Sequence, residues 1–325
     1  MAAFRRAGLL DSMWDCPIHS GGIANANSVF NLTCALLLLP CVGIYEKLSH
    51  RLIKDKPAPV GKYDEMLDAL NPVFISTPAV AFGRCYDILL VMYQLASTNI
   101  GRAFNMFTQY DPEVMKQMQA DEGYIDSIAD HVSNYLVQIS ASITAQYHVE
   151  IMNYYFSAIT EFERLGDHAL NMADIAAELA GKDSAFSKDA LSELAVLWKL
   201  LDTILGHTHE AFRKQNSAEA RRIEPLEQVV DDMVGVLKQN HLKRLRDGEC
   251  EVFNGSEFFN LLSEAERISD VCSNVGVATV ARATPGIKHH IHDYISVLHS
   301  GRDEEFNRVY QAVHDEYFRQ LPGRE

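Results

Sequence analysis

Long runs of helical periodicity constrain this chain more than any other feature. From about Thr77 onward, apolar residues recur with a 3.6-residue period over runs of roughly 25 to 35 residues, while strand signals and prolines are sparse. These runs predict an all-α fold. The long helices are expected at 77–108, 111–142, 147–180, 187–215, 218–246 and 256–282, with a shorter helical tail near 287–320.

Local signals mark where several of these helices begin. Thr77-Pro78 and Asp111-Pro112 each place an N-cap residue before a proline at the first helical position. Ser187 and Ser217 are further N-cap candidates, because a serine hydroxyl accepts a hydrogen bond from the first turn of a helix.

The six long helices form two sets of three that repeat in detail. One motif occurs as E-R-L-G-D-H-A-L-N at 163–171 and again as E-R-I-S-D-V-C-S-N at 266–274, an offset of 103 residues. Acidic residues in the other helices repeat at offsets of 105 or 106 residues, and these are Glu122 with Glu227, Asp126 with Asp231, and Asp87 with Glu193. Such nearly constant offsets indicate a tandem duplication of a three-helix unit. We therefore expect repeat 1 at 77–181, repeat 2 at 182–284 and a helical tail at 285–325.

Four pairs of carboxylates occupy helix positions i and i+4, which places both members of a pair on one face, about one turn apart. The pairs are Glu122 and Asp126, Glu163 and Asp167, Glu227 and Asp231, and Glu266 and Asp270. Like charges at this spacing repel each other, and a cation between them would remove that cost. Carboxylates on facing helices of a bundle bind hard cations such as Mg²⁺, Mn²⁺, Ca²⁺ or iron.

The position of these acids around each helix leaves two interpretations open. Glu163 and Asp167 lie about 100° or more from the centre of the apolar face of their helix, so they flank the core. They therefore belong either to a metal- or ligand-binding face or to a solvated acidic face. The repetition of the pairs in register favours the first. His168 is an additional candidate ligand or a structural histidine, whereas His289, His290 and His292 are expected to be surface residues.

A second notable feature is an uncharged apolar run at 29–44, which reaches the length of a membrane span when it is extended to 23–45. Basic residues follow it at 47–56, a pattern typical of the cytoplasmic end of a span. We expect a transmembrane helix with its basic collar at 23–56, with a buried core helix as the alternative. A linker follows at 57–76, and residues 1–22 remain unassigned.

Composition excludes several function classes. The net charge of −15 argues against a nucleic-acid binder, because acidic surfaces repel a phosphate backbone. Six scattered cysteines indicate a reducing compartment without disulfides. The sequence contains no Glu-x-x-His, phosphate-binding loop or nucleophile elbow, so we expect no enzyme activity.

The duplicated motif at 163–171 and 266–274 resembles the signature of PhoU domains, which are paired three-helix regulators of phosphate signalling. Segments 70–81, 224–232 and 241–250 resemble the PhoU region fused to bacterial sodium/phosphate cotransporters. The segment I-A-N-A-N-S-V-F-N-L at 23–32, with the A-L-L-L-L-P that follows, resembles the last membrane helix of those transporters. The resemblance covers roughly residues 23–320.

This resemblance implies two three-helix bundles side by side, with the four carboxylate pairs at the metal-binding positions of the family. Multinuclear clusters of Fe, Mn, Mg or Zn are implied at the surface. Val271 stands where the fused family has a histidine, which implies a weaker second site. The repeated Gln-Ser-Ser-type motifs of the transporter body are absent, so we expect a fragmentary or split gene product.

The function expected from these observations is that of a cytoplasmic, metal-binding PhoU-type regulatory domain of a sodium-dependent phosphate cotransporter, tethered to the bacterial inner membrane by one helix. Its partner would be the membrane-embedded transporter domain. A phosphate-sensing kinase and a second copy of the chain are further expected partners. Two alternatives stay open: a subunit of a split sodium/phosphate symporter, and a soluble PhoU-like signalling adaptor.

Overall fold

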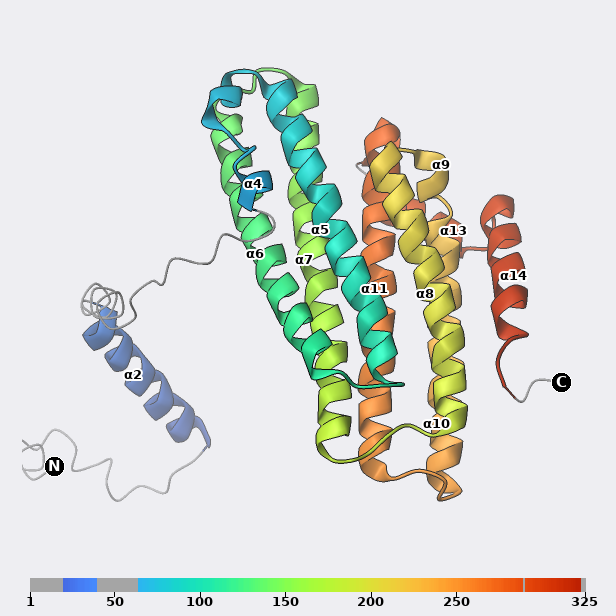
Figure 1. Cartoon of the computed structure of the whole chain (residues 1–325). Helices are drawn as coiled ribbons and strands as arrows, with labels where there is room; N and C mark the ends of the chain where they lie inside the picture. Colours follow the sequence, from blue (N-terminus) through green and yellow to red (C-terminus); the bar gives the residue numbers. More distant parts are fainter. Residues whose placement is uncertain (1–19, 40–63, 289, 323–325) are drawn as a thin grey trace, which may run out of the picture. The chain divides into compact units, whose positions relative to one another are not determined.

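The structure, a computed structural model, describes residues 20–39, 64–288 and 290–322. Contacts divide the chain into two compact units, residues 1–61 and 62–325, which we describe separately. Within the described ranges every regular element is a helix, as Figure 1 shows. The all-α fold expected from the periodicity is therefore confirmed.

Repeat 1 is a three-helix bundle of α5 (Pro78–Met106), α6 (Pro112–Ser140) and α7 (Gln146–Gly181), each packed against the other two (Figure 1). These bounds agree closely with the predicted ranges. The Asp111 side chain caps α6 by accepting a hydrogen bond from the Glu113 amide, whereas Thr77 stands at the N-cap of α5 without a side-chain hydrogen bond.

Repeat 2 contains α8 (Lys188–Lys214), α10 (Ile223–Arg246) and α11 (Val252–Ala283), with the one-turn helix α9 (Ser217–Ala220) between the first two. Ser187 caps α8 as predicted, but Asn216 and not Ser217 caps α9. The helix predicted at 218–246 is broken, because Pro225 has no amide hydrogen and its ring clashes with the carbonyl four residues earlier. The helix predicted from 256 begins at Val252.

The two repeats share one hydrophobic core, which is continuous from α5 to α11. α7 packs against α11 and α5 against α8. At this junction the Phe162 ring lies 5.0 Å from the ring centroids of both Tyr93 and Phe212 in edge-to-face contacts. Three fully buried aromatic rings from three helices thus fix how the repeats sit against each other.

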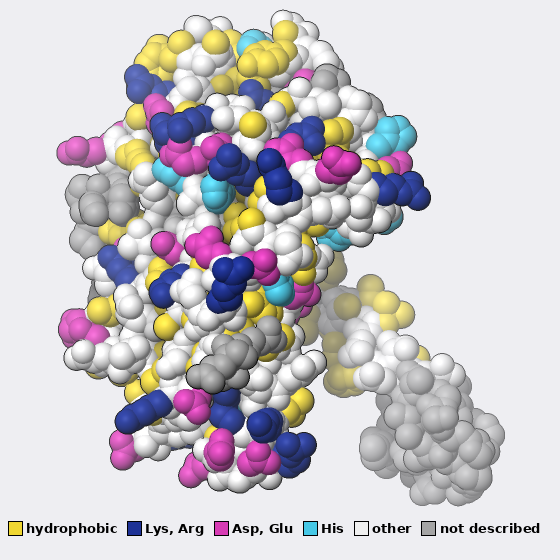
Figure 2. Space-filling view, turned by 90° about the vertical axis from the view of Figure 1, so that its right-hand side faces the viewer, with side chains coloured by type: hydrophobic (Ala, Val, Ile, Leu, Met, Phe, Trp, Pro, Cys, Tyr) yellow, Lys and Arg dark blue, Asp and Glu magenta, His cyan; other side chains and the backbone are white. Residues whose placement is uncertain are grey.

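The C-terminal tail forms α12 (Pro285–Lys288), α13 (Ile291–His299) and α14 (Glu304–Phe318), and α14 packs along α10. The Tyr310 hydroxyl donates to Asp232 at 2.6 Å, and the Tyr317 hydroxyl lies 2.7 Å from that of Thr203. Figure 2 views the side of Figure 1 on which α14 lies, and charges of both signs are interspersed over it.

The described part of the predicted linker packs on repeat 1. It forms α4 (Asp64–Leu67) and the 3-10 helix η2 (Pro72–Ser76), and η2 contacts both α5 and α6. The Tyr135 hydroxyl donates to the Asn71 carbonyl at 2.9 Å. Residues 64–76 are therefore a folded edge of the bundle.

The apolar N-terminal segment contains α2 (Ser20–Leu38), an uncharged helix in which Leu36 and Leu37 are each 68% exposed. Its apolar part within the described residues, Asn27–Leu38, is shorter than a membrane span. Among the described residues one helix, α5, is long and apolar enough to cross a membrane, and half of its most apolar window is buried in the bundle. The membrane span at 23–45 thus stays a prediction, and its last residues and the basic collar at 47–56 lie outside the described residues.

Candidate metal centres

Repeat 1 brings two of the predicted carboxylate pairs together, and we call them acidic cluster 1. Glu122 and Asp126 lie on α6, and Glu163 and Asp167 lie on the neighbouring α7. The pKa values of Glu122 and Glu163 are raised, first by partial burial and then by the negative charge of the other carboxylates in the cluster. Four acids from two helices therefore share one electrostatic environment that favours a cation.

Repeat 2 contains the matching acidic cluster 2, with Glu227 and Asp231 on α10 and Glu266 and Asp270 on α11. Burial, followed by the charge of Asp231, raises the pKa of Glu227 to about 8. Burial, followed by the charges of Glu266 and Asp270, raises the pKa of Asp231 to about 6. One carboxylate oxygen of Asp231, Oδ1, is buried without a hydrogen-bond partner. An unsatisfied buried oxygen among repelling acids fits a site for a metal ion.

The clusters differ in depth. Asp126 and Asp167 of cluster 1 are exposed, in keeping with the flanking position expected from the helical wheel. Glu227 of cluster 2 is only 9% exposed, which is deeper than the wheel predicts. The difference follows from the tail, because α14 covers α10 and no counterpart of α14 packs on the described part of α6.

His168 lies between the two clusters. Burial and neighbouring acids raise the pKa values of Asp167 and Asp270, and His168, whose side chain is buried, partly opposes both rises. Its Nδ1 is 2.8 Å from a carboxylate oxygen of Glu264, while its Nε2 is buried without a partner. Metal-ligating histidines commonly hold a carboxylate with the other ring nitrogen in this way. Val271, its counterpart in repeat 2, is a fully buried core residue.

Two further glutamates, Glu161 and Glu264, lie beside the clusters and are not among the residues predicted from the sequence. Glu161 accepts hydrogen bonds from Arg164 on its own helix and, across the repeat junction, from Asn274. Glu264 accepts the equivalent bonds from Arg267 and Asn171. The two glutamates are themselves 103 residues apart, so extending the duplicated motif by two residues finds them.

This symmetric arrangement gives the arginine and asparagine of the motif a physical role. The two asparagines join α7 to α11, and the two arginines hold the same glutamates from within their own helices. The motif therefore encodes both the carboxylates and the contact between the repeats.

Asp87 and Glu193, which match in the sequence, do not share an environment. Asp87 is exposed, whereas Glu193 is 2% exposed and accepts hydrogen bonds from Asn240 and Arg244, both at 2.7 Å. Glu193 is thus half of a buried ion pair, and neither residue belongs to the acidic clusters.

Glu224 and His299 were also missed. His299 Nε2 lies 2.9 Å from Glu224 Oε1, and Ser273 donates to the other oxygen of Glu224. His290 pairs instead with the exposed Asp293, and His292 is exposed, as expected of surface residues; His289 lies outside the described residues. No local signal identifies His299, because its partner is 75 residues away.

Comparison with known proteins finds similarity over part of the chain. Residues 89–176, which run from α5 to α7 and include cluster 1, match the PhoU domain. Two curated proteins from different strains of Streptococcus pneumoniae, each named phosphate-specific transport system accessory protein PhoU homolog, are 23% identical over 119 residues. That match covers 37% of this chain and 54% of each relative, so the chain spans about half the length of the curated relatives it matches.

Solved structures extend the likeness to the fold. The crystal structure of PhoU from Pseudomonas aeruginosa has a TM-score of 0.58 at 17% identity, and the match covers 62% of this chain and 96% of that one. The phosphate transport system regulatory protein PhoU from Streptococcus pneumoniae has a TM-score of 0.57 at 16% identity, covering 64% and 98%. Residues 89–176 therefore match the PhoU domain, and they lie within a helical fold similar to that of the two PhoU crystal structures.

Proposed function

We propose that this chain is a PhoU-type regulator of phosphate uptake whose two acidic clusters bind divalent or multinuclear metal. The observation that carries the metal assignment is the pairing of the acids across helices, with Asp231 Oδ1 and His168 Nε2 buried and unpartnered beside them. Oxygen ligands suit Mg²⁺ and Mn²⁺, and an added imidazole extends the range to iron and zinc. A bound cation would stabilise the carboxylates, and the protein would act by binding without turnover.

We further infer that α2 tethers this regulator to a membrane-embedded sodium/phosphate transporter, with the helical bundle on the cytoplasmic side. Support comes from the resemblance at 23–32 and from the leucines that α2 exposes without any charge among Ser20–Leu38. Exposed apolar side chains on an uncharged helix need a lipid or protein partner.

One rival function is a soluble adaptor that contacts a phosphate-sensing kinase. The observation that favours it is the likeness to proteins named as accessory components of a phosphate-specific transport system. A subunit of a split symporter is the remaining alternative, and it requires a second chain that supplies the transport path.

One experiment separates these functions. The full chain and its Leu36→Glu, Leu37→Glu variant are expressed in cells that lack the chain, and membrane association and sodium-dependent phosphate uptake are measured for both. We expect the wild-type chain to sediment with membranes and to change the uptake rate, and the variant to do neither, because two charges in a span are costly. Val252→Glu, at a position 84% exposed on α11, is the matched control and should behave as wild type.

Other outcomes would favour one of the alternative functions or contradict the regulatory role. A soluble wild-type chain that still alters uptake identifies the adaptor. Uptake that appears only when a second chain is supplied identifies the split symporter, and uptake unaffected by every form contradicts the regulatory role.

A further inference from the structure

The tail places one histidine against the first turn of α10. Glu224 and Glu227 lie three residues apart on that turn and share a face, and His299 is the last residue of α13. One ligand atom from each of the three residues lies within 4.8 Å of the other two. Only Glu227 belongs to acidic cluster 2, so this group extends the cluster toward the tail.

Glu227 is nine-tenths buried, and no hydrogen bond or ion pair joins it to another residue whose side chain the structure describes. Glu224 is 6% exposed, and its carboxylate already accepts a hydrogen bond from Ser273 and pairs with His299. Two buried carboxylates in contact with one imidazole are costly unless a cation balances them.

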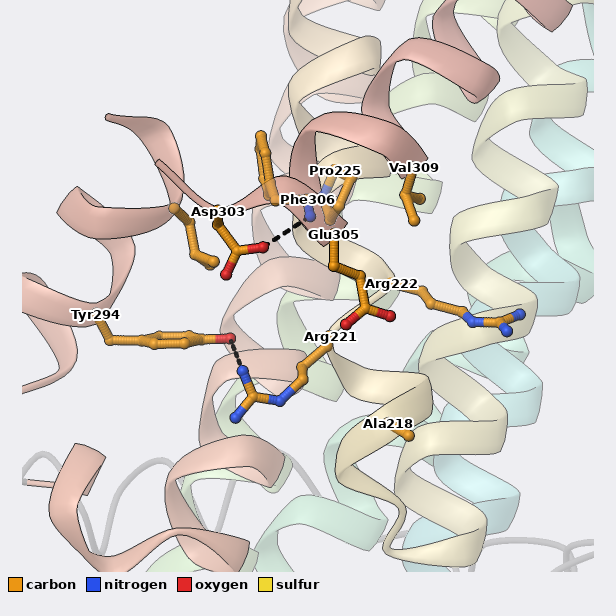
Figure 3. Close-up of a pocket in the computed structure, with 10 residues that line it drawn as sticks. Ala218, Arg221, Arg222, Pro225, Tyr294, Asp303, Glu305, Phe306 and Val309 are labelled. Carbon is orange, nitrogen blue, oxygen red and sulfur yellow. Dashed lines mark hydrogen bonds between the residues drawn. The ribbon is translucent and has the colours of Figure 1, made fainter. Parts of the chain in front are cut away.

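The nearby basic side chains are engaged elsewhere. Figure 3 shows Arg221 reaching toward Tyr294, whose hydroxyl lies 3.4 Å from the guanidinium, and Arg222 pointing away from it. The Arg221 guanidinium also lies 5.6 Å from the Tyr294 ring centroid. Lys238 is 3.0 Å from Glu266 at the other side of cluster 2. No lysine or arginine whose side chain the structure describes therefore pairs with Glu224 or Glu227.

We propose that Glu224, Glu227 and His299 form a divalent transition-metal site that fastens the C-terminal tail to repeat 2. The inference rests on the proposed function in that it shares Glu227 with cluster 2. Two carboxylate oxygens and one imidazole nitrogen suit zinc or iron better than Mg²⁺, which prefers oxygen ligands alone. Zinc bonds of about 2.1 Å bring ligand atoms to within about 4 Å of one another, so small side-chain rotations close the site.

The site couples the metal to the docking of α13 and α14. His299 is the tail ligand, and Tyr310 donates to Asp232, which is the neighbour of the cluster residue Asp231. The tail itself buries Leu298 and Phe306 in this region. A metal ion therefore stabilises the docked tail over cluster 2, and its removal loosens α13 and α14.

The test uses the full chain as wild type, His299→Ala and His299→Gln, with Zn²⁺ as the probe and Mg²⁺ as the comparison ion. Glutamine keeps a hydrogen-bond donor for Glu224 but no imidazole nitrogen for the metal, so it separates the metal from the docking contact. His292→Ala, an exposed histidine on the same helix, is the matched control. The readouts are Zn²⁺ affinity by competition with a chelator and amide hydrogen exchange across 291–318.

We expect Zn²⁺ at about 100 times its Kd to slow exchange in the wild-type tail by up to about 100-fold, with no such effect from Mg²⁺. His299→Gln should keep the metal-free exchange pattern, lose the zinc response and bind Zn²⁺ about 10- to 100-fold more weakly at this site. His292→Ala should match wild type. Zinc affinity and tail protection unchanged in both His299 variants would overturn the inference.

A cluster 1 variant separates this inference from the proposed function. Glu122→Gln with Glu163→Gln should leave the zinc response of the tail intact. If that variant removes all Zn²⁺ binding while the tail never responds, cluster 1 is a metal site and the tail site is wrong. If the wild-type chain binds no divalent ion, both fail.

Discussion

Neutralising two acids of cluster 2, with Glu227→Gln and Asp231→Asn, is expected to stabilise the metal-free protein and to abolish its stabilisation by metal. Glutamine and asparagine mimic the protonated carboxyls in shape and remove the repulsion between them. At pH 8 we expect the free energy of unfolding to rise by roughly 1–3 kcal/mol without metal. A saturating divalent ion, which adds about 2.7 kcal/mol to the wild type at 100 times its Kd, should add far less to the variant.

The same two residues are expected to make the stability of the metal-free protein depend on pH. The pKa of Glu227 is raised from 4.5 to about 8, and that of Asp231 from 3.8 to about 6, so the folded state holds protons that the unfolded state has lost. Their contribution to stability is therefore fully present below about pH 4 and is lost as the pH rises through 6 and 8. The metal-free wild type should lose stability across this window on the order of a few kcal/mol, and the double variant should not.

Chemical denaturation of chelator-treated protein between pH 5 and pH 8.5, with and without Mn²⁺, measures these effects. Asp202→Asn with Glu316→Gln, at two exposed positions outside the clusters, is the matched control. A double variant that is less stable than wild type without metal, and equally stabilised by Mn²⁺, would contradict the assignment of cluster 2.

Arg244→Met is expected to cause a large loss of stability, about 3–5 kcal/mol. Arg244 Nη2 lies 2.7 Å from Glu193 Oε2, and the side chains are 9% and 2% exposed. Removing the guanidinium leaves the Glu193 carboxylate buried with only Asn240 as a hydrogen-bond partner. Methionine also loses the contact of the guanidinium with the Phe258 ring, 5.7 Å away.

Repeat 1 offers a matched comparison. Arg102 pairs with Asp121 in the same manner, but the Arg102 side chain is 36% exposed. Arg102→Met should therefore cost less than Arg244→Met, because water can enter the partly solvated space that the Arg102 guanidinium leaves, and Gln117 still donates a hydrogen bond to the buried Asp121 carboxylate. Urea denaturation of both variants measures the difference. Glu193→Leu combined with Arg244→Met should recover much of the loss, and equal losses for the two arginines would show that burial does not set the cost.

Much of the fold could be predicted because its signals are local. Helix periodicity and the caps at Asp111 and Ser187 act within a few residues, and those helices begin where predicted. The break between α9 and α10 was harder to predict, because the apolar pattern there is continuous and favours one helix, whereas Pro225 favours a break. The start of α11 at Val252, earlier than predicted, could not be read from the sequence, because the N-cap residue Glu251 makes no side-chain capping hydrogen bond.

Part of the candidate site could likewise be predicted from local signals, and part could not. Spacing i, i+4 places two carboxylates on one face of a helix, and the duplication indicates that α6 with α7 corresponds to α10 with α11. The partner of His168, in contrast, is Glu264, 96 residues away, and that of His299 is Glu224, 75 residues away. Such contacts depend on packing between repeats and on the docking of the tail, which local periodicity does not encode.

The metal content of the full chain tests the central claim most directly. Wild-type protein and a variant with Glu122→Gln, Glu163→Gln, Glu227→Gln and Glu266→Gln are purified without chelators and compared by inductively coupled plasma mass spectrometry. We predict that the wild type retains at least one Fe, Mn, Mg or Zn ion for each acidic cluster, and that the variant, equally helical by circular dichroism, retains none. Wild-type protein that carries no more metal than the variant would contradict the account.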